Sequence, residues 1–164
     1  MKPRPFPLAL NIGTDIVHLP RVAALLTRRN TNLTRFTHRI LCAQEQRDFH
    51  ARFKDTLQPH SHVSPPTQPA QSITPDMTRW LAGRFAAKEA ARKAAPDGAA
   101  SIGWKDVMVQ IQKDGRADVH GEGVSRRPEI VYMGREEDGS PGRVARLSIS
   151  HDGEYVVATV LAAG

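Results

Sequence analysis

Cysteine is almost absent from this sequence. Cys42 is the only one among 164 residues, so no disulfide can form within the chain and a cysteine-rich zinc site is excluded. Residues 1–7 are basic and proline-rich and lack the apolar stretch of a secretory signal. We therefore expect an intracellular, reducing location, either the cytoplasm or the mitochondrial matrix.

Aromatic residues and long apolar runs are also scarce. Phe, Trp and Tyr make up 5% of the chain, and no stacking motif of the RNA-binding kind occurs. No apolar run approaches the roughly 20 residues that are needed to span a bilayer. We therefore expect neither a nucleic acid nor a membrane as a partner.

Several well-known catalytic signatures are missing as well. The sequence has no Gly-x-Ser-x-Gly nucleophile elbow. It also has no P-loop and no dinucleotide-binding glycine fingerprint. These absences argue against a serine hydrolase and against the common nucleotide-binding loops.

The residues that are present are typical of a small globular protein with a basic surface. Hydrophobic residues make up 40% of the chain and charged residues 24%, and the length fits a single domain over 1–164. The formal net charge is +6. Such a charge attracts phosphates, nucleic acids or acidic proteins over long range, although solubility alone is another explanation.

The hydropathy pattern predicts a mixture of strands and helices. Short segments alternate between apolar and polar residues, as strands do, whereas Pro20 and Thr74-Pro75-Asp76 are typical of helix starts. Strands are predicted at 8–16, 107–111, 130–132, 144–150 and 155–162, and helices at 20–29, 43–53 and 75–95. The strand at 130–132 is expected to be exposed or at an edge, with turns at 114–115 and 151–153. The predicted class is α+β, with a largely antiparallel sheet packed against one long helix and shorter helices.

Residues 54–75 have a different composition from the rest of the chain. They carry five prolines among serines, threonines and glutamines, which predicts a flexible surface insertion. His60 and His62 lie inside it. Because ordering a mobile loop costs conformational entropy, we interpret these histidines as solvated residues rather than metal ligands.

Two acidic residues are candidates for a magnesium site. Taken singly, Asp15 is typical of a turn or a helix cap, and Glu89, four residues before Lys93, is typical of a surface ion pair. Taken together, two carboxylates suit magnesium, which completes its shell with waters and substrate phosphates. Lys93, Lys88 and Arg84 share the long helix and are expected to neutralise phosphates. This combination favours a metal-assisted displacement at phosphorus.

Small residues surround these charges, and a histidine follows one of the last strands. Five alanines keep the long helix slim, which allows a backbone or a bulky ligand to approach closely, although helix propensity is a plainer explanation. They are Ala86, Ala87, Ala90, Ala91 and Ala94.

His151, after Ser148 and Ser150, belongs either to a polar pocket or simply to a strand end.

Together these segments resemble the holo-acyl-carrier-protein synthase family, the small single-domain type of 4′-phosphopantetheinyl transferase. The matching segments are Gly13-Thr14-Asp15-Ile16, Phe85-Ala86-Ala87-Lys88-Glu89-Ala90-Ala91-Arg92-Lys93-Ala94, Gly103-Trp104-Lys105-Asp106-Val107 and Ser148-Ile149-Ser150-His151. They occur in the family's order along nearly the whole chain outside the insertion. The chain departs from the pattern at Val17, where larger relatives have a second acidic residue, and at His18, where many members have glutamate.

The resemblance implies an activity and a role for each of these residues. Asp15 and Glu89 would hold Mg²⁺ together with the pyrophosphate of coenzyme A, Lys93 would contact phosphate, and Arg84 and His151 would hold the coenzyme. The serine hydroxyl of an acyl carrier protein would attack the β-phosphate, and 3′,5′-ADP would leave. Glu89 or a metal-bound water would accept the serine proton.

The resemblance also implies how the chain meets its partners. Family members often form trimers with coenzyme A between neighbouring subunits, so a homotrimer is expected. They dock the acidic acyl carrier protein on basic residues of the first helix. Arg21 and Arg28 share one exposed face by helical phase, and Arg35 is a third candidate.

Two other functions stay open from the residues alone. A basic binding module would hold a nucleotide or an acidic protein without any chemistry and without magnesium. A magnesium phosphohydrolase would release phosphate or pantetheine without a protein acceptor. Magnesium-dependent transfer to a protein acceptor distinguishes the transferase from both.

Overall fold

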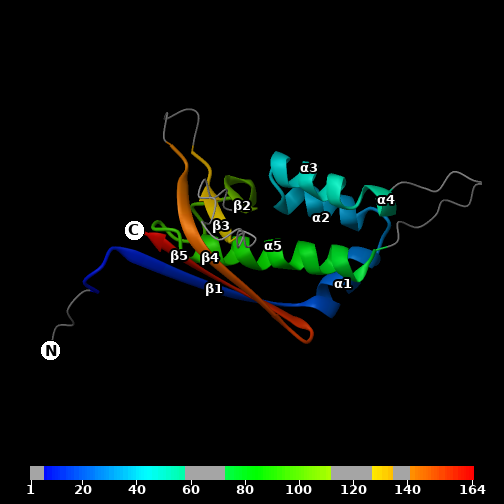
Figure 1. Ribbon diagram of the computed structural model, residues 1–164, viewed down its shortest axis with the longest axis horizontal. Helices are drawn as coiled ribbons and strands as arrows, with labels where there is room; N and C mark the ends of the chain where they lie inside the picture. The colour runs from blue at the N-terminus through cyan, green and yellow to red at the C-terminus, as the bar shows by residue number, and fades with distance from the viewer. Residues whose placement is uncertain (1–5, 58–72, 112–126, 135–140) are drawn as a thin grey trace, which may run out of the picture.

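The computed structural model describes residues 6–57, 73–111, 127–134 and 141–164. The strands form one five-stranded sheet in the order β1-β5-β4-β3-β2, with neighbouring strands antiparallel. They are β1 (Leu10–His18), β2 (Val107–Ile111), β3 (Pro128–Tyr132), β4 (Arg143–Asp152) and β5 (Tyr155–Ala163). Figure 1 shows the long helix α5 (Pro75–Lys93) lying along this sheet. The predicted α+β class with an antiparallel sheet is confirmed.

The remaining helices are short. They are α1 (Leu19–Thr27), α2 (Asn32–Ile40), α3 (Ala43–Arg52), α4 (Lys54–Leu57) and the 3-10 turn η1 (Trp104–Asp106). The start of α5 is the predicted one: the Thr74 hydroxyl accepts a hydrogen bond from the Met77 amide at 3.1 Å, and Pro75 is the first helical residue. No helix was expected at the position of α2. Its signal was the spacing of three residues that the structure buries on one side, Leu33, Thr37 and Ile40.

Alanine side chains allow α5 to lie close to the strands. Ala86, Ala87, Ala90 and Ala91 are fully buried, and α5 packs against β1 and β5. A Cβ atom added to Gly13 of β1 would lie 2.1 Å from the carbonyl oxygen of Ala90, which is closer than atoms can approach. The expectation that small residues permit a close backbone approach is confirmed, and the approaching backbone is that of β1.

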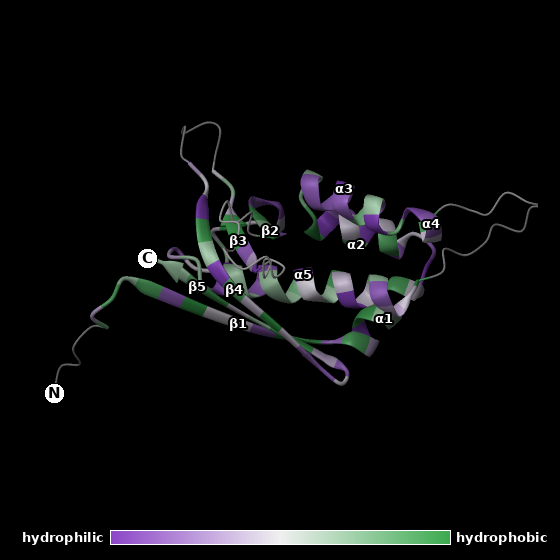
Figure 2. Cartoon of the chain, in the orientation of Figure 1, coloured by the Kyte–Doolittle hydropathy of each residue, from purple (hydrophilic) through white to green (hydrophobic). Residues whose placement is uncertain are grey.

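On its other side α5 contacts α2 and α3 through aromatic rings. The Phe85 ring lies 5.9 Å from that of Phe36 in α2, and the Trp80 ring lies 5.4 Å from that of Phe49 in α3. The rest of α3 is largely hydrophilic and is purple in Figure 2. In Figure 1, α5 therefore lies between β1 and the pair formed by α2 and α3.

The prediction of an exposed or edge strand at 130–132 is wrong. β3 pairs with β2 on one side and with β4 on the other, and Ile130 is fully buried. The Tyr132 hydroxyl donates a hydrogen bond to the Ala91 carbonyl at 2.8 Å, and burial raises the pKa of this tyrosine. A strand of only five residues gives too short a pattern to distinguish an interior position from an edge.

Some predicted boundaries also change. Lys54–Leu57 forms the helix α4 rather than part of a flexible insertion, while 58–72 and the turn predicted at 114–115 lie outside the described residues. His151 and Asp152 belong to β4, so the hairpin turns at Gly153, which has a φ of +51°. Within the described ranges, none of the helices combines the length and the apolar character that a bilayer-spanning segment requires.

Candidate active site

The cleft that contains both predicted magnesium ligands lies between β1, α1 and α5. Its volume is about 620 Å³. Asp15, Glu89 and Lys93 line it together, and so do Arg21 of α1 and Arg28, which follows the last residue of that helix. Apolar side chains complete the lining, including those of Leu25, Phe36 and Phe85. One open cleft therefore combines carboxylates, cations and an apolar surface.

Asp15 faces this cleft because of the alternation along β1. It shares the α5 side of the strand with Gly13 and Val17, both of which are buried. Its carboxylate accepts a hydrogen bond from the Lys93 ammonium at 2.9 Å, and the same ammonium donates to the Thr14 carbonyl at 2.9 Å. Asp15 pairs with Ala158 within the sheet, so neither of the two simpler roles, a turn residue or a helix cap, is correct.

Glu89 reaches the cleft from α5 and has a different cationic partner. The Arg92 guanidinium donates a hydrogen bond to its Oε1 atom at 2.9 Å. The surface ion pair between Glu89 and Lys93 that their spacing suggested does not form, because Lys93 turns to Asp15. Each carboxylate is thus held by its own cation, and the two cations are consecutive residues of α5.

Asp15 and Glu89 offer the type of ligand that magnesium uses, and in this structure each carboxylate is paired with a cation. Magnesium is commonly bound by one or two carboxylates and keeps other positions for waters and phosphate oxygens. Within the described residues, no cluster of three or more His, Cys, Asp or Glu side chains offers a metal site. A site completed by the substrate suits a pair of carboxylates in an open cleft, whereas a closed structural metal site would need more protein ligands.

Arg84 and His151 lie together in a second hollow of about 280 Å³, which Trp80 and Arg52 also line. The Arg84 guanidinium stacks 3.3 Å from the centre of the Trp80 ring. Its Nε atom is buried without a hydrogen-bond partner among the described residues, and the Oε1 atom of the Glu45 carboxylate lies 3.9 Å from it. Burial lowers the pKa of Arg84 to about 10, although nearby Glu45 opposes the shift, so the group is charged at neutral pH. With 19% of the Arg84 side chain exposed, the charged guanidinium is suited to bind an anion at this hollow.

The expectation that Lys88 contacts phosphate is wrong. Its side chain is fully buried, forms an ion pair with Glu45 of α3, and donates hydrogen bonds to the carbonyls of Ile40 and Trp104 at 2.7 and 2.9 Å. Burial lowers the pKa of Lys88, while the Glu45 carboxylate opposes that shift. Three donors with three partners leave no capacity for a ligand. Lys88 therefore joins α5 to α2, α3 and η1.

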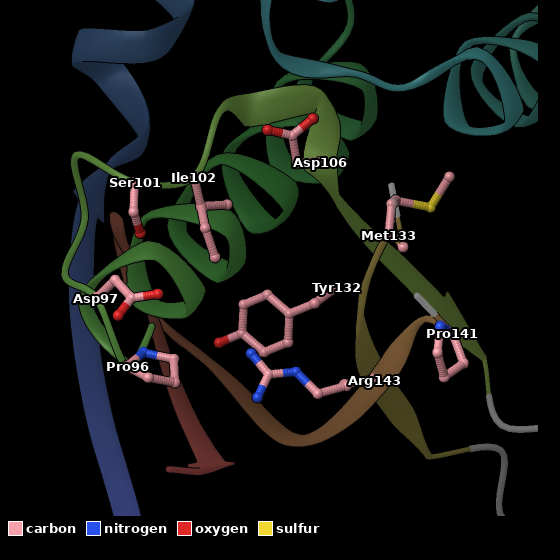
Figure 3. Close-up of a pocket in the computed structure, with 10 residues that line it drawn as sticks. Pro96, Asp97, Ser101, Ile102, Asp106, Tyr132, Met133, Pro141 and Arg143 are labelled. Carbon is pink, nitrogen blue, oxygen red and sulfur yellow. The ribbon is translucent and has the colours of Figure 1, made fainter. Parts of the chain in front are cut away.

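A third hollow, shown in Figure 3, has a volume of about 310 Å³ and contains none of the predicted site residues. In Figure 3 the Arg143 side chain lies against the Tyr132 ring, and Asp97 lies across the pocket from Arg143. The guanidinium carbon is 6.0 Å from the centre of the ring. The Tyr132 hydroxyl already donates a hydrogen bond to the Ala91 carbonyl. Of the predicted site residues, Asp15, Glu89 and Lys93 line the cleft, and Arg84 and His151 line the second hollow.

The sequence model of the 4′-phosphopantetheinyl transferase superfamily matches residues 11–160. The chain belongs to this superfamily. It is 58% identical to 4′-phosphopantetheinyl transferase B, mitochondrial, from Aspergillus fumigatus, with 100% of both chains covered. It is 32% identical to a holo-[acyl-carrier-protein] synthase from Oceanobacillus iheyensis, over 92% of each chain. The resemblance and the enzyme class that the motifs indicated are confirmed.

Solved structures of the superfamily share the fold. The holo-[acyl-carrier-protein] synthase from Neisseria meningitidis matches with a TM-score of 0.58 and 27% identity, over 94% of this chain and 98% of that chain. The synthase from Bacillus anthracis, described in complex with CoA (3′,5′-ADP), matches with a TM-score of 0.57 and 24% identity, over 94% and 96%. The long helix against an antiparallel sheet is thus the superfamily's architecture.

Two of the three basic residues predicted to dock the carrier line the cleft. Arg21 and Arg28 are exposed and both line the cleft. Arg35 is exposed on α2 and is not one of the lining residues. Arg21 and Arg28 therefore share a surface beside the candidate catalytic carboxylates, as their helical phase predicted.

The structure adds site residues that the motifs did not single out. Arg92 holds Glu89, and its place three residues further along the helix was the available signal. His18 also lines the cleft, and its ring lies 3.3 Å from the Glu154 carboxylate. Glu154 lies in the β4–β5 turn and also accepts a hydrogen bond from the Leu19 amide through its carbonyl. No sequence pattern connects His18 with a turn 136 residues away.

Proposed function

We propose that this chain transfers 4′-phosphopantetheine from coenzyme A to a serine of an apo-acyl carrier protein, in a reaction that requires magnesium. The products are holo-acyl carrier protein and 3′,5′-ADP. The observation that carries the proposal is the meeting of Asp15, Glu89 and Lys93 in one open cleft of a chain that belongs to the 4′-phosphopantetheinyl transferase superfamily.

The proposed reaction is a displacement at the β-phosphorus of coenzyme A. The serine oxygen forms a bond to this phosphorus, and the bond from phosphorus to the oxygen bridging the two phosphates breaks, so 3′,5′-ADP leaves with the bond electrons. A magnesium ion on Asp15 and Glu89 would neutralise charge on the pyrophosphate. Oε1 of Glu89 is held by Arg92, so Oε2 is the atom left either to bind the metal ion or to accept the serine proton, directly or through a water.

Cations of the chain would bind the rest of the coenzyme. Lys93 lies at the cleft with its ammonium 2.9 Å from Asp15, from which it can turn to a phosphate once another cation neutralises the aspartate. Arg84 offers a positive charge at the second hollow, which His151 also lines. We assign an anionic group of coenzyme A to this second hollow.

A surface of the sheet supports the homotrimer as part of the proposal. On the side of the sheet away from α5, β1 exposes Ile12 and Ile16, with 69% and 62% of their surfaces accessible. Leu161 of β5 pairs in register with Ile12 and is also exposed. Large exposed apolar patches commonly mark protein interfaces.

The acidic carrier and the compartment complete the proposed function. The net charge of +6 and the two arginines beside the cleft, Arg21 and Arg28, favour an acidic carrier protein, whose approach would be steered by opposite charge. Arg35, which is exposed outside the cleft, stays a third candidate for binding the carrier. The mitochondrial name of the Aspergillus fumigatus relative favours the mitochondrial matrix over the cytoplasm.

Mass spectrometry of an apo-acyl carrier protein incubated with this chain, coenzyme A and magnesium tests the function directly. We expect a mass gain of one phosphopantetheine on the carrier, which EDTA abolishes. Glu89→Gln should reduce the rate by at least 100-fold while the circular dichroism spectrum stays that of the wild type, since the side chain faces the cleft and general-base contributions are commonly about 10²–10⁴-fold.

Other results would favour the alternatives. Coenzyme A binding without any mass gain would indicate a binding module. Release of phosphate or pantetheine without a carrier would indicate a phosphohydrolase. A Glu89→Gln protein that fails to fold would show that this residue is structural.

A further inference from the structure

Arg92 makes more contacts than a helix-surface arginine requires. Its Nη1 atom donates to Glu89 Oε1 at 2.9 Å, its Nε donates to the Ile102 carbonyl at 2.8 Å, and its Nη2 donates to the Ala99 carbonyl at 2.9 Å. The guanidinium also lies 5.1 Å from the centre of the Trp104 ring. All three nitrogens of the planar fork are therefore engaged at once.

These contacts hold the Arg92 guanidinium in one orientation independently of Glu89. Two of the three bonds go to backbone carbonyls of the segment 99–102, which follows α5, and the Trp104 ring lies beside the guanidinium. The guanidinium is planar and presents its donors in a rigid fork, so holding two nitrogens also fixes the direction of the third. The carboxylate of Glu89 is consequently held at a defined place at the cleft, with Oε2 not engaged by any described residue.

A second ion pair on α5, between Arg79 and Asp76, provides the comparison with an exposed pair of the same spacing. Arg79 donates to Asp76 at 2.9 Å with the same i,i+3 spacing, but 51% and 72% of these side chains are exposed. For Arg92 and Glu89 the exposed fractions are 21% and 22%. An exposed pair is screened by water and contributes little, whereas a largely buried, charge-assisted hydrogen bond restrains the group that it holds.

We infer that Arg92 is a positioning residue that orients the Glu89 carboxylate for metal binding. The inference rests on the proposed function, in which Glu89 is a magnesium ligand. Groups that hydrogen-bond a metal-binding carboxylate orient it, and their loss commonly weakens metal affinity or activity by about 10–100-fold. Without Arg92, the Glu89 side chain regains its rotamers and must be ordered again each time a metal ion binds.

The test compares Arg92→Met, Arg92→Lys and the wild type. Methionine keeps much of the unbranched stem but has no donor, and lysine keeps the charge without the fork. Mn²⁺ binding is measured by electron paramagnetic resonance on each protein without coenzyme or carrier, and the Mg²⁺ dependence of transfer is measured separately. The matched control is Arg47→Met, which removes an exposed arginine with an i,i+3 hydrogen bond to Gln44 on α3.

We expect Arg92→Met to bind Mn²⁺ about 10–100-fold more weakly and to need correspondingly more Mg²⁺ for half-maximal transfer, with the KM for the carrier unchanged. Arg92→Lys should recover part of the affinity, and Arg47→Met should match the wild type. Wild-type Mn²⁺ affinity in a folded Arg92→Met protein would overturn the inference. If Arg92→Met does not fold, wild-type Mn²⁺ affinity in a folded Arg92→Lys protein would overturn the inference instead. A wild type that transfers nothing to the carrier would instead overturn the proposed function itself.

Discussion

At the scale of single residues, the cations of α5 differ in function because they differ in their neighbours. Lys88 is fully buried with Glu45 and contributes to the fold, and Arg92 holds Glu89. Lys93 is half exposed at the cleft and is bound to Asp15. Arg84 alone has a buried donor that no described residue satisfies. That donor, the Nε atom, lies 3.9 Å from the Glu45 carboxylate, while the charged guanidinium also lines the second hollow, where it can attract an anion.

Arg84→Met is therefore expected to weaken coenzyme binding. The loss of a charge-assisted hydrogen bond costs about 1.5–3 kcal/mol, so the KM for coenzyme A should rise about 10-fold or more, while the KM for the carrier stays unchanged. Steady-state kinetics with each substrate varied in turn measures both quantities. With a pKa of about 10, Arg84 keeps its charge through the pH range in which the assay is run. A lower melting temperature with an unchanged KM for coenzyme A would show that Arg84 only packs against Trp80.

At the scale of elements, the distance between β1 and α5 determines where the two candidate metal ligands meet. Asp15 is carried by β1 and Glu89 by α5. The backbones approach at Gly13, where any side chain would collide with the carbonyl of Ala90 and the amide of Ala94. The glycine two residues before Asp15 thus permits the packing that brings its carboxylate to the cleft.

Gly13→Ala should force β1 away from α5. Because the obstructing atoms belong to a helix backbone, they cannot move aside as a flexible side chain would, and overpacking of this kind costs about 1–3 kcal/mol or more. Urea denaturation should show this loss of unfolding free energy, and the Mg²⁺ requirement should rise because Asp15 is displaced.

The matched control for Gly13→Ala is the same change at Gly83 of α5. A Cβ atom there meets nothing within 4 Å, and alanine is favoured over glycine inside a helix by about 1 kcal/mol. Gly83→Ala should therefore be at least as stable as the wild type. Equal stability of Gly13→Ala and the wild type would contradict the close packing of β1 on α5.

At the scale of the whole molecule, the two faces of the sheet differ. The face toward α5 is covered by that helix, whereas β1 and β5 expose Ile12, Ile16 and Leu161 on the opposite face. The same strand therefore supplies Asp15 to the cleft and an apolar surface to the outside. Self-association through that surface would place the back of each candidate active site against another subunit.

Ile12→Glu should convert the proposed trimer into monomers. The side chain is 69% exposed in the single chain, so the substitution should not disturb the core, but a charge buried without a partner at an interface is strongly unfavourable. Sedimentation velocity measures the outcome, with Ile111→Glu, 49% exposed at the end of β2, as the control. A wild type that sediments as a monomer at assay concentrations, or an Ile12→Glu protein that stays trimeric, would contradict this arrangement.

The amino-acid sequence by itself determined the class of fold, the main elements and the motif residues. Alternation along 107–111 and the cap at Thr74 predicted β2 and the start of α5, because strand alternation and helix capping are local properties. The order of motifs around Asp15 and Glu89 indicated the superfamily that the family match confirmed.

Only the tertiary structure decided how those residues are paired. The periodicity of an element shows which of its residues share a face, but not which element lies opposite that face. For this reason spacing alone suggested a pair between Glu89 and Lys93 and a phosphate contact for Lys88, whereas the fold pairs Lys93 with Asp15 and buries Lys88 with Glu45. A charged group pairs with an oppositely charged group that the fold brings close in space. For Lys93 that group is the carboxylate of Asp15, which lies 78 residues away in the sequence.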